Sequence, residues 1–288
     1  MLPGMGGKVR ISIFGAGRLA NALAPFLRSA GYEIDEVIAR RSGSSLADAR
    51  RLAKAIAGKA RPLATARLNA KIIWVCVPDT AIAQSAASLA GRTEWKGKVV
   101  FHSSGALASD ELHPLRKAGA SVASVHPLMT FVRGSQPRLD RVPFAIEGDP
   151  GAVKLARRLV RDLGGRPYMI RKADKAAYHA WGTFASPLFT GLLVTAEQVA
   201  TIAGVPRKEA QRRMIPILLQ TLANYASLGP ARAFSGPIVR GDVQTVKRHL
   251  EVLRKSPAAR DVYLALARAT LLYLPHKHDA ALRKSLQG

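Results

Sequence analysis

The sequence has a single cysteine, few acidic residues and no long uninterrupted hydrophobic run. Cys76 has no second cysteine to pair with, which excludes an internal disulfide, so we expect a buried, inert thiol in a reducing compartment, the cytoplasm. The longest apolar region, residues 188–205, is interrupted by Glu197 and Gln198, which favours a core helix over a membrane span. Because the first predicted strand begins close to the first residue, we expect no signal peptide.

Acidic residues are scarce beside basic ones: 19 Asp and Glu stand against 44 Lys and Arg, a net charge of +25. Such an excess is typical either of a nucleic-acid-binding protein or of an enzyme with arginine-rich helix faces and anionic ligands. The basic residues are spread along predicted helices and form no tail, and neither zinc-finger spacing nor an aromatic RNA-binding signature occurs. The sequence therefore favours the enzyme, and it indicates no metal site.

A glycine-rich turn follows the first predicted strand, residues 9–14. The turn has the sequence Gly15-x-Gly17-x-x-Ala20, the spacing of a dinucleotide-binding loop. Gly15 permits the tight turn, Gly17 lets the backbone approach a pyrophosphate, and Ala20 lets the next helix pack close to the strand. The start of that helix offers free N–H groups and a partial positive charge to phosphates. The predicted cofactor-binding residues of this loop are Gly15, Ala16, Gly17, Arg18 and Leu19.

The second predicted strand, residues 34–39, ends in Arg40, Arg41 and Ser42. NAD-binding sites usually place an acidic residue here, to bind the 2′-hydroxyl of the ribose, and this strand end has none. Two guanidinium groups and a hydroxyl suit a 2′-phosphate, so we expect NADP in preference to NAD. The alternative is that all three are solvent-exposed loop residues.

A third strand, residues 71–77, is continuously apolar, as a parallel sheet buried on both faces requires. Val77, Pro78 and Asp79 close it, and in this architecture they are expected beside the nicotinamide half of a bound cofactor. The alternative is structural: Pro78 forms a turn, and Asp79 caps the next helix.

Two further strands, residues 98–101 and 121–125, are followed by polar side chains. Ligands of open α/β sheets bind outside the carboxyl ends of the strands, so Ser104 and His126 are candidate site residues. A structural role is the alternative for His126. Beyond residue 172 only helical patterns occur, and the first long helix, residues 174–203, carries His179 and Ser186.

The fold that these elements predict is α/β, with a doubly wound parallel sheet followed by an all-helical domain. The sheet occupies residues 1–172, and the helices occupy residues 173–288. Pro187 is expected to kink the first of these helices.

Motifs spread over nearly the whole chain resemble a single family. They are Gly15-Ala16-Gly17, Val77-Pro78-Asp79, His102-Ser103-Ser104-Gly105-Ala106, His126-Pro127-Leu128-Met129-Thr130-Phe131, Glu147-Gly148-Asp149, Tyr178-His179-Ala180, Phe184-Ala185-Ser186 and residues 236–242. The chain resembles Rossmann-like NADP oxidoreductase-type proteins with an all-helical C-terminal domain of unknown function. These are distant relatives of pyrroline-5-carboxylate reductase, 6-phosphogluconate dehydrogenase and the β-hydroxyacid dehydrogenases. The resemblance implies a helical domain like that of 6-phosphogluconate dehydrogenase and a homodimer formed through it. Where this chain has Pro187, the family has Asn, which weakens the transfer of a substrate-binding role to this position.

We therefore expect an NADPH-dependent reductase of a small carbonyl or imine. The nucleotide supplies the hydride, and the protein supplies orientation and a proton. His126 or His179 is the expected proton donor, because the unperturbed pKa of histidine is close to neutral. Ser104 and Ser186 are expected to orient the substrate. The alternatives are a non-catalytic NADP-binding regulator, suggested by Pro187, and a nucleic-acid-binding protein, suggested by the charge.

Overall fold

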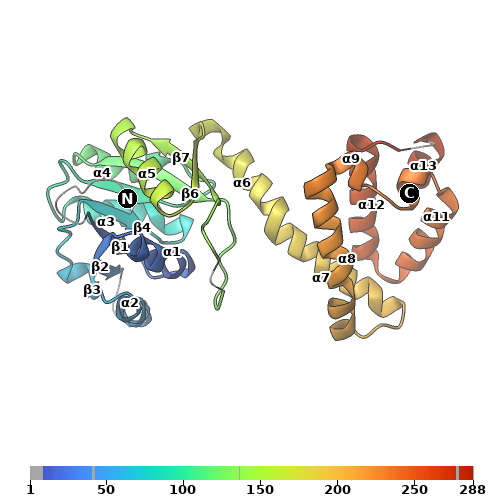
Figure 1. Cartoon of the computed structure of the whole chain (residues 1–288), viewed down its shortest axis with the longest axis horizontal. Coiled ribbons are helices and arrows are strands. Elements are labelled where there is room, and N and C mark those ends of the chain that lie inside the picture. The colour runs from blue at the N-terminus through green and yellow to red at the C-terminus, as the bar shows by residue number, and fades with distance from the viewer. Residues whose placement is uncertain (1–8, 41–42, 136, 277–278, 288) are drawn as a thin grey trace. The chain divides into compact units, whose positions relative to one another are not determined.

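The computed structural model describes residues 9–40, 43–135, 137–276 and 279–287. The chain divides into two compact units, Met1–Phe184 and Ala185–Gly288. All strands of the described residues lie in the first unit (Figure 1). This unit continues past the last strand to Phe184, because residues 175–183, the first part of the predicted helix 174–203, are joined to the sheet by hydrogen bonds of Lys175.

The first unit is built on one eight-stranded sheet with the order β3-β2-β1-β4-β5-β6-β7-β8. The strands are β1 (Arg10–Phe14), β2 (Glu33–Ala39), β3 (Lys59–Pro62), β4 (Ile72–Val75), β5 (Val99–His102), β6 (Ser121–Pro127), β7 (Pro143–Gly148) and β8 (Arg166–Met169). β1 lies third in this order, parallel to β2 on one side and to β4 on the other. The first connection leads to β2 and the later strands add beyond β4, so the strand order reverses beside β1, as in a doubly wound sheet.

One pair of strands departs from the predicted parallel arrangement: β7 runs antiparallel to β6, with His126 opposite Ala145. No helix connects these two strands in the described residues between Pro127 and Pro143. A parallel neighbour needs a crossover connection, usually a helix, whereas a chain that returns directly lies antiparallel. The sheet is therefore mixed, and the other neighbouring pairs are parallel.

Helices cover both faces of the sheet. The helices of this unit are α1 (Arg18–Ser29), α2 (Ser44–Ala55), α3 (Ile82–Ala90), α4 (His113–Lys117), α5 (Pro150–Asp162) and α6 (Lys175–Thr183), with the 3₁₀ turns η1 (Leu63–Thr65), η2 (Asp79–Ala81), η3 (Ser109–Leu112) and η4 (Lys172–Asp174). One apolar cluster joins the sheet to α1, α2 and α5, and a second joins it to α3 and α4. Successive side chains of a strand point to opposite faces. Accordingly, Ile13 packs in the first cluster and Phe14 in the second.

The second unit is helical throughout its described residues. Its elements are the π-helical segment η5 (Phe184–Leu188), which starts at the last residue of the first unit, α7 (Phe189–Ile202), α8 (Arg207–Leu228), α9 (Pro230–Ala233), α10 (Pro237–Arg240), α11 (Val243–Val252), η6 (Leu253–Lys255), α12 (Pro257–Tyr273) and α13 (Asp279–Ser285). Its buried core comes from α11, α12 and α13, with Val246, Leu264 and Leu282 among its members. Pro187 lies in η5, where the wider π turn accommodates a residue without an N–H.

No single helix in the described ranges is long and apolar enough to cross a membrane. The stretches Lys172–Ile202 and Arg207–Leu228 meet that test only as a pair, and the pair is bent by 119° at the break between them.

Candidate active site

The glycine turn after β1 has the strained geometry that its sequence predicts. Gly15 has a φ of +97°, and a Cβ there would lie 2.6 Å from the backbone oxygen of Cys76. The Gly15 N–H donates to Ile38 O at 2.8 Å, and the Cys76 N–H donates to Phe14 O at 2.8 Å. The turn is therefore held against both neighbouring strands, and only glycine fits its first position.

Gly17 is different, because packing within the protein does not require a glycine there. It has an extended backbone and is exposed, and an added Cβ would make only an ordinary 3.6 Å contact with Cys76 O. It precedes α1, whose start has no side-chain cap among the described residues. The Asn21 amide donates to the carbonyl oxygens of Ala16 and Gly17 at 2.9 Å each, which fixes the loop. An open backbone and uncapped N–H groups at a helix start are the features that bind a pyrophosphate.

A cavity of about 280 Å³ connects this loop with the end of β2. It is lined by Gly15, Ala16, Gly17, Arg40, Ser44, Ser45, Asp48, Cys76, Val77 and Pro78. Arg40 is exposed at the strand end, as the sequence predicts. Ser44 and Ser45, the first residues of α2, were not among the predicted site residues, and a Ser pair at a helix start was their only signal in the sequence. Arg41 and Ser42 lie outside the described residues.

The remaining predicted loop residues have different environments. Arg18 is exposed at the first position of α1, and Leu19 is half-buried and packs against the core. Their N–H groups are the uncapped donors of that helix start. Arg18 and Leu19 would therefore bind a ligand through their backbone N–H groups, which does not depend on the identity of their side chains.

Asp79 and Ser104 meet across the ends of β4 and β5. The Ser104 hydroxyl donates to the exposed Asp79 carboxylate at 2.7 Å and accepts from Leu107 N–H at 2.8 Å. Ser104 itself is buried, with 3% of its surface exposed. Its hydroxyl therefore fixes the turn and Asp79, and its predicted role of orienting a substrate stays a prediction.

Lys175, the first residue of α6, is a buried lysine that was not among the predicted site residues. Its Nζ donates to Ser104 O at 2.9 Å and to Ser124 Oγ at 2.8 Å. Burial lowers the pKa of Lys175 to about 8, and the carboxylates of Glu147 and Asp79 act in the opposite direction. A buried ammonium group with one acceptor after the end of β5 and one on β6 ties α6 to these two neighbouring strands.

His126, Tyr178 and His179 form an aromatic group beside Gly105. His126 Nδ1 lies 2.8 Å from Tyr178 Oη, and the His126 ring is edge-on to the Tyr178 and His179 rings, with centroids 5.4 and 6.3 Å away. A Cβ on Gly105 would lie 2.8 Å from His126 Nε2 and 2.6 Å from His179 Cδ2. The bare backbone of Gly105 is thus what admits both imidazoles to this position.

The two imidazoles differ in access to solvent. Burial lowers the pKa of His126 to about 4, and the positive charge of Lys175 and the neighbouring His179 act in the same direction. The His126 ring is therefore neutral at pH 7, so the near-neutral pKa on which its predicted role rested does not apply to it. His179 is exposed.

The last predicted catalytic residue, Ser186, belongs to the second unit. Among the residues that the structure describes, no group of three His, Cys, Asp or Glu side chains could hold a metal ion.

Comparison with known families divides the chain into two matched regions. Residues 5–127 match the model of the Rossmann-like domain, and residues 142–270 match that of a domain of unknown function, DUF2520. The chain pairs a Rossmann-like domain with a DUF2520 domain. No curated protein matches its sequence. The start of the DUF2520 region, at residue 142, includes β7, α5 and β8 of the sheet, as well as Lys175, Tyr178 and His179 on α6.

The Rossmann-like and DUF2520 pair has a fold shared with solved oxidoreductase structures. A Bacteroides fragilis protein described as a candidate NADP oxidoreductase is 23% identical, with a TM-score of 0.76 over 91% of this chain and 97% of that one. A reductive aminase from Aspergillus terreus, in complex with NADPH and ethyl-5-oxohexanoate, is 17% identical, with a TM-score of 0.66 over 98% and 99%. A pyrroline-5-carboxylate reductase from Coxiella burnetii is 14% identical, with a TM-score of 0.57 over 97% and 98%. At these identities the likeness establishes the fold, which is that of dehydrogenase-like proteins.

Proposed function

We propose that the protein is an NADPH-dependent oxidoreductase that reduces a small carbonyl or imine. The observation that carries the proposal is the loop Gly15–Gly17, where one glycine is required by the fold and the other is left open beside an uncapped helix start. A loop that served only the fold would need the first glycine but not the second. The reductase and reductive aminase of similar fold support the same class of reaction.

Arg40 supports NADPH over NADH. It is the exposed guanidinium at the end of β2, and it lines the same cavity as Gly17. The cavity also contains the hydroxyls of Ser44 and Ser45 at the start of α2. A guanidinium, two hydroxyls and a helix N-terminus are donors that suit a 2′-phosphate. Asp48 is the one carboxylate in the lining, and its Oδ1 pairs with Arg51.

Hydride would come from the bound nucleotide, and the chain must supply one proton, which an imine nitrogen takes up before the hydride is transferred and a carbonyl oxygen takes up as it is reduced. His179 is the proposed donor, because its imidazole is exposed on α6. His126 is proposed to position His179. Its neutral imidazole forms a hydrogen bond with the Tyr178 hydroxyl and packs edge-on against the His179 ring. A proton donor must lie within about 2.6–3.2 Å of the atom that it protonates. Gly105 gives the His126 and His179 rings room beside its backbone, and the reacting atom would be held against the exposed imidazole of His179.

Asp79 favours an imine over a neutral carbonyl compound. Its carboxylate is exposed at the carboxyl end of β4, and the Ser104 hydroxyl fixes its orientation. A protonated imine carries a positive charge that a carboxylate attracts, whereas a ketone gains nothing comparable from it. We therefore propose a cationic imine, free or formed from a carbonyl compound and an amine, as the preferred substrate.

The test is a screen of cyclic imines, and of ketones with and without an amine, for oxidation of NADPH. His179→Ala is expected to lower kcat at least about tenfold and to leave the Kd for NADPH unchanged, because general acid catalysis contributes about 10²–10⁴-fold. Thr183→Ala, one turn further along α6, is the control, since its hydroxyl donates a hydrogen bond to the His179 carbonyl and not to the imidazole. Tight NADPH binding without turnover of any substrate would instead indicate a non-catalytic, NADP-binding regulator.

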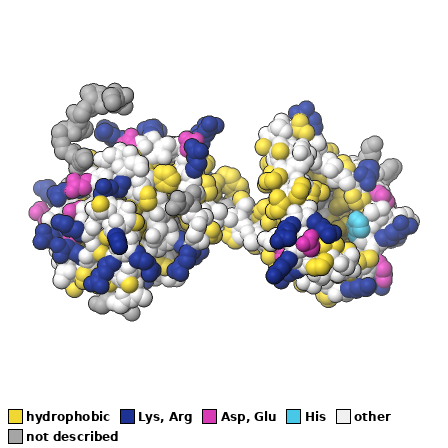
Figure 2. All heavy atoms as spheres, turned by 60° about the horizontal axis from the view of Figure 1, so that its bottom comes forward, with side chains coloured by type: hydrophobic (Ala, Val, Ile, Leu, Met, Phe, Trp, Pro, Cys, Tyr) yellow, Lys and Arg dark blue, Asp and Glu magenta, His cyan; other side chains and the backbone are white. Residues whose placement is uncertain are grey.

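We also propose that the protein is a cytoplasmic homodimer joined through its helical unit. In α7 no residue is buried, and in α8 only Ala210 is buried. The exposed side chains of α8 include Ile217, Leu219, Leu222 and Tyr225, with 53–67% of their surface accessible. Hydrophobic side chains form a broad area on the visible face of this unit (Figure 2). A 22-residue helix with an exposed apolar face needs a partner, and a second copy presents the same face.

A further inference from the structure

The amino-terminal edge of the sheet gathers positive charge. Arg10 is the first residue of β1, Lys71 precedes β4, and Lys98 precedes β5. These strands are parallel neighbours in the sheet, with Ile11 opposite Ile72 and Ile72 opposite Val99. Because parallel strands begin at the same edge, three cations that are far apart in the sequence lie side by side. This edge is opposite to the glycine loop and about 16 Å from it, the length of a five-residue strand.

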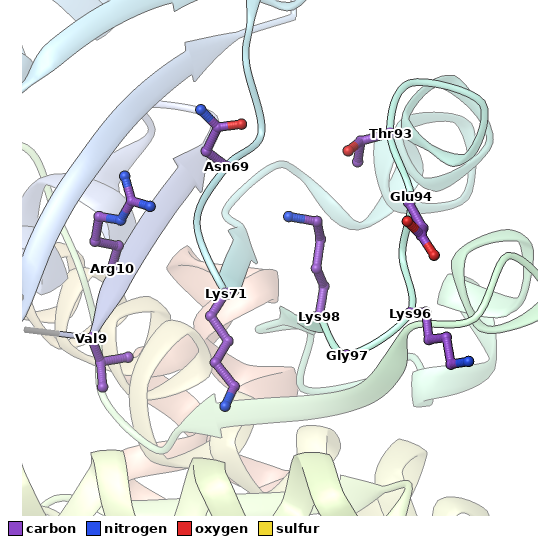
Figure 3. Close-up of a pocket in the computed structure, with 9 residues that line it drawn as sticks. All are labelled: Val9, Arg10, Asn69, Lys71, Thr93, Glu94, Lys96, Gly97 and Lys98. Carbon is purple, nitrogen blue, oxygen red and sulfur yellow. The ribbon is translucent and has the colours of Figure 1, made fainter. Parts of the chain in front are cut away.

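A cavity of about 620 Å³ opens at this edge, the size of a small-molecule site. It is lined by Val9, Arg10, Asn69, Lys71, Thr93, Glu94, Lys96, Gly97 and Lys98. Figure 3 shows Lys98 extending toward the space between Asn69 and Thr93, with Arg10 on one side and Glu94 on the other. Residues from three separate segments of the chain therefore converge on one opening.

The lining has more positive charge than the protein itself neutralises. Arg10 has one carboxylate partner, Asp35, at the long distance of 3.8 Å. Lys98 Nζ is half-buried and donates to two carbonyl oxygens, Leu68 O at 2.8 Å and Ala70 O at 3.4 Å. Lys71 and Lys96 are exposed and pair with no carboxylate in the described part of the chain. Glu94 is the only acidic residue of the lining.

We propose that this cavity is a second ligand site, one that binds a compact polyanion carrying two or more phosphate groups. Four cations, the Asn69 amide and the Thr93 hydroxyl supply donors on several sides of one opening. None of the nine lining residues is aromatic, so the site has no surface on which a nucleobase could stack. The chemistry of the lining therefore selects a ligand with dense negative charge and without a base. This site does not depend on nucleotide binding at the opposite edge.

The experiment is calorimetric titration of the full chain with inorganic tripolyphosphate at constant ionic strength. The double variant Lys71→Ala/Lys96→Ala removes two exposed ammonium groups that form no ion pair with the carboxylates of the described residues. Its Kd is expected to be at least tenfold higher than that of the wild type, because charge-assisted hydrogen bonds to phosphate are strong. The matched control is Lys154→Ala/Arg161→Ala, which removes two exposed charges from α5 and is expected to leave the Kd unchanged.

A third variant separates the two edges of the sheet, because the glycine loop could also bind tripolyphosphate. Arg40→Ala changes only the carboxyl edge, so its Kd for the proposed site is expected to equal that of the wild type. A loss of binding in Arg40→Ala with none in Lys71→Ala/Lys96→Ala would overturn the proposal. An equal loss of tripolyphosphate affinity in the Lys71/Lys96 and Lys154/Arg161 variants would also overturn the proposal. That result would show that the anion is attracted only by the overall charge of the protein.

Discussion

The ammonium group of Lys175 donates a hydrogen bond to the backbone carbonyl of Ser104, although 71 residues separate them in the sequence. The Ser104 hydroxyl donates a hydrogen bond to the Asp79 carboxylate. The next residue, Gly105, is the one against which His126 and His179 pack. One buried charge on α6 therefore sets the position of the strand ends that form the candidate site. It is a positioning residue, since its donors are directed at the protein itself.

Replacing Lys175 with Met tests this role. The change removes the Nζ donor of Ser104 O and of Ser124 Oγ, and it leaves Ser104 O with the 3.2 Å bond from the Ser124 hydroxyl, so we expect the free energy of unfolding to fall by about 1–3 kcal/mol. It also removes a positive charge that lowers the pKa of His126, so this pKa is expected to rise above about 4, as followed by NMR titration of the imidazole. Lys172→Met, which removes an exposed ion pair with Asp110, is the control. An unchanged His126 midpoint in the Lys175→Met variant would contradict the electrostatic account.

Stability should depend on pH through His126. Its pKa is about 4 in the folded protein and 6.5 for the unperturbed group, so between these values the unfolded chain binds more protons. The free energy of unfolding is then expected to fall as the pH drops from 6.5 to 4, by at most about 3 kcal/mol from this residue. Urea unfolding of the wild type and of His126→Gln at several pH values measures this change in the free energy of unfolding. The variant should lose less stability over this range, and parallel curves for the two proteins would argue against a buried neutral imidazole.

The two glycines of the loop should separate folding from binding. Gly15→Ala places a Cβ 2.6 Å from Cys76 O at a positive φ, so we expect a destabilised protein. Gly17→Ala meets nothing closer than 3.6 Å, so we expect near wild-type stability with at least tenfold weaker binding of NADPH. Thermal unfolding and fluorescence titration of both variants give the comparison. Full NADPH affinity in a stable Gly17→Ala protein would show that the ligand does not approach this residue.

The apolar face of α8 should control the oligomeric state. Ile215, Leu219 and Leu222 are exposed at helical spacing on one side of α8. We expect Leu219→Glu/Leu222→Glu to be monomeric in sedimentation analysis at concentrations where the wild type is a dimer, because burying two carboxylates at an interface is costly. Gln220→Glu adds a charge on the same helix at a polar position and should leave the dimer intact. A wild-type protein that sediments as a monomer would contradict the proposed dimer.

Local sequence patterns were sufficient for most of the regular elements and for the glycine turn. Gly15 and Gly17 are recognisable because their spacing follows from backbone geometry, β4 is a run of apolar residues, and β1 and β2 are rich in isoleucine and other apolar residues. β3 was missed because its sequence, Lys-Ala-Arg-Pro, is that of a charged edge strand with a proline. The reversal of β7 did have a signal, the lack of a helical pattern between residues 128 and 142.

The chemistry of the site could be predicted only in part, because it depends on contacts between distant residues. Lys175 resembles any lysine at the start of an exposed helix, and only the fold reveals that it is buried. The contact of His126 with Tyr178 joins residues 52 positions apart, and it accompanies the burial that lowers the histidine pKa. Ser104 was identified from its position after a strand, but its bond to Asp79, 25 positions away, could not be predicted from the sequence.

Direct titration of NADPH and NADH into the purified protein, followed by nucleotide fluorescence, tests the central claim. The account predicts saturable binding of NADPH and at least tenfold weaker binding of NADH, with the preference reduced in Arg40→Ala. Failure of both nucleotides to bind at millimolar concentration would contradict it.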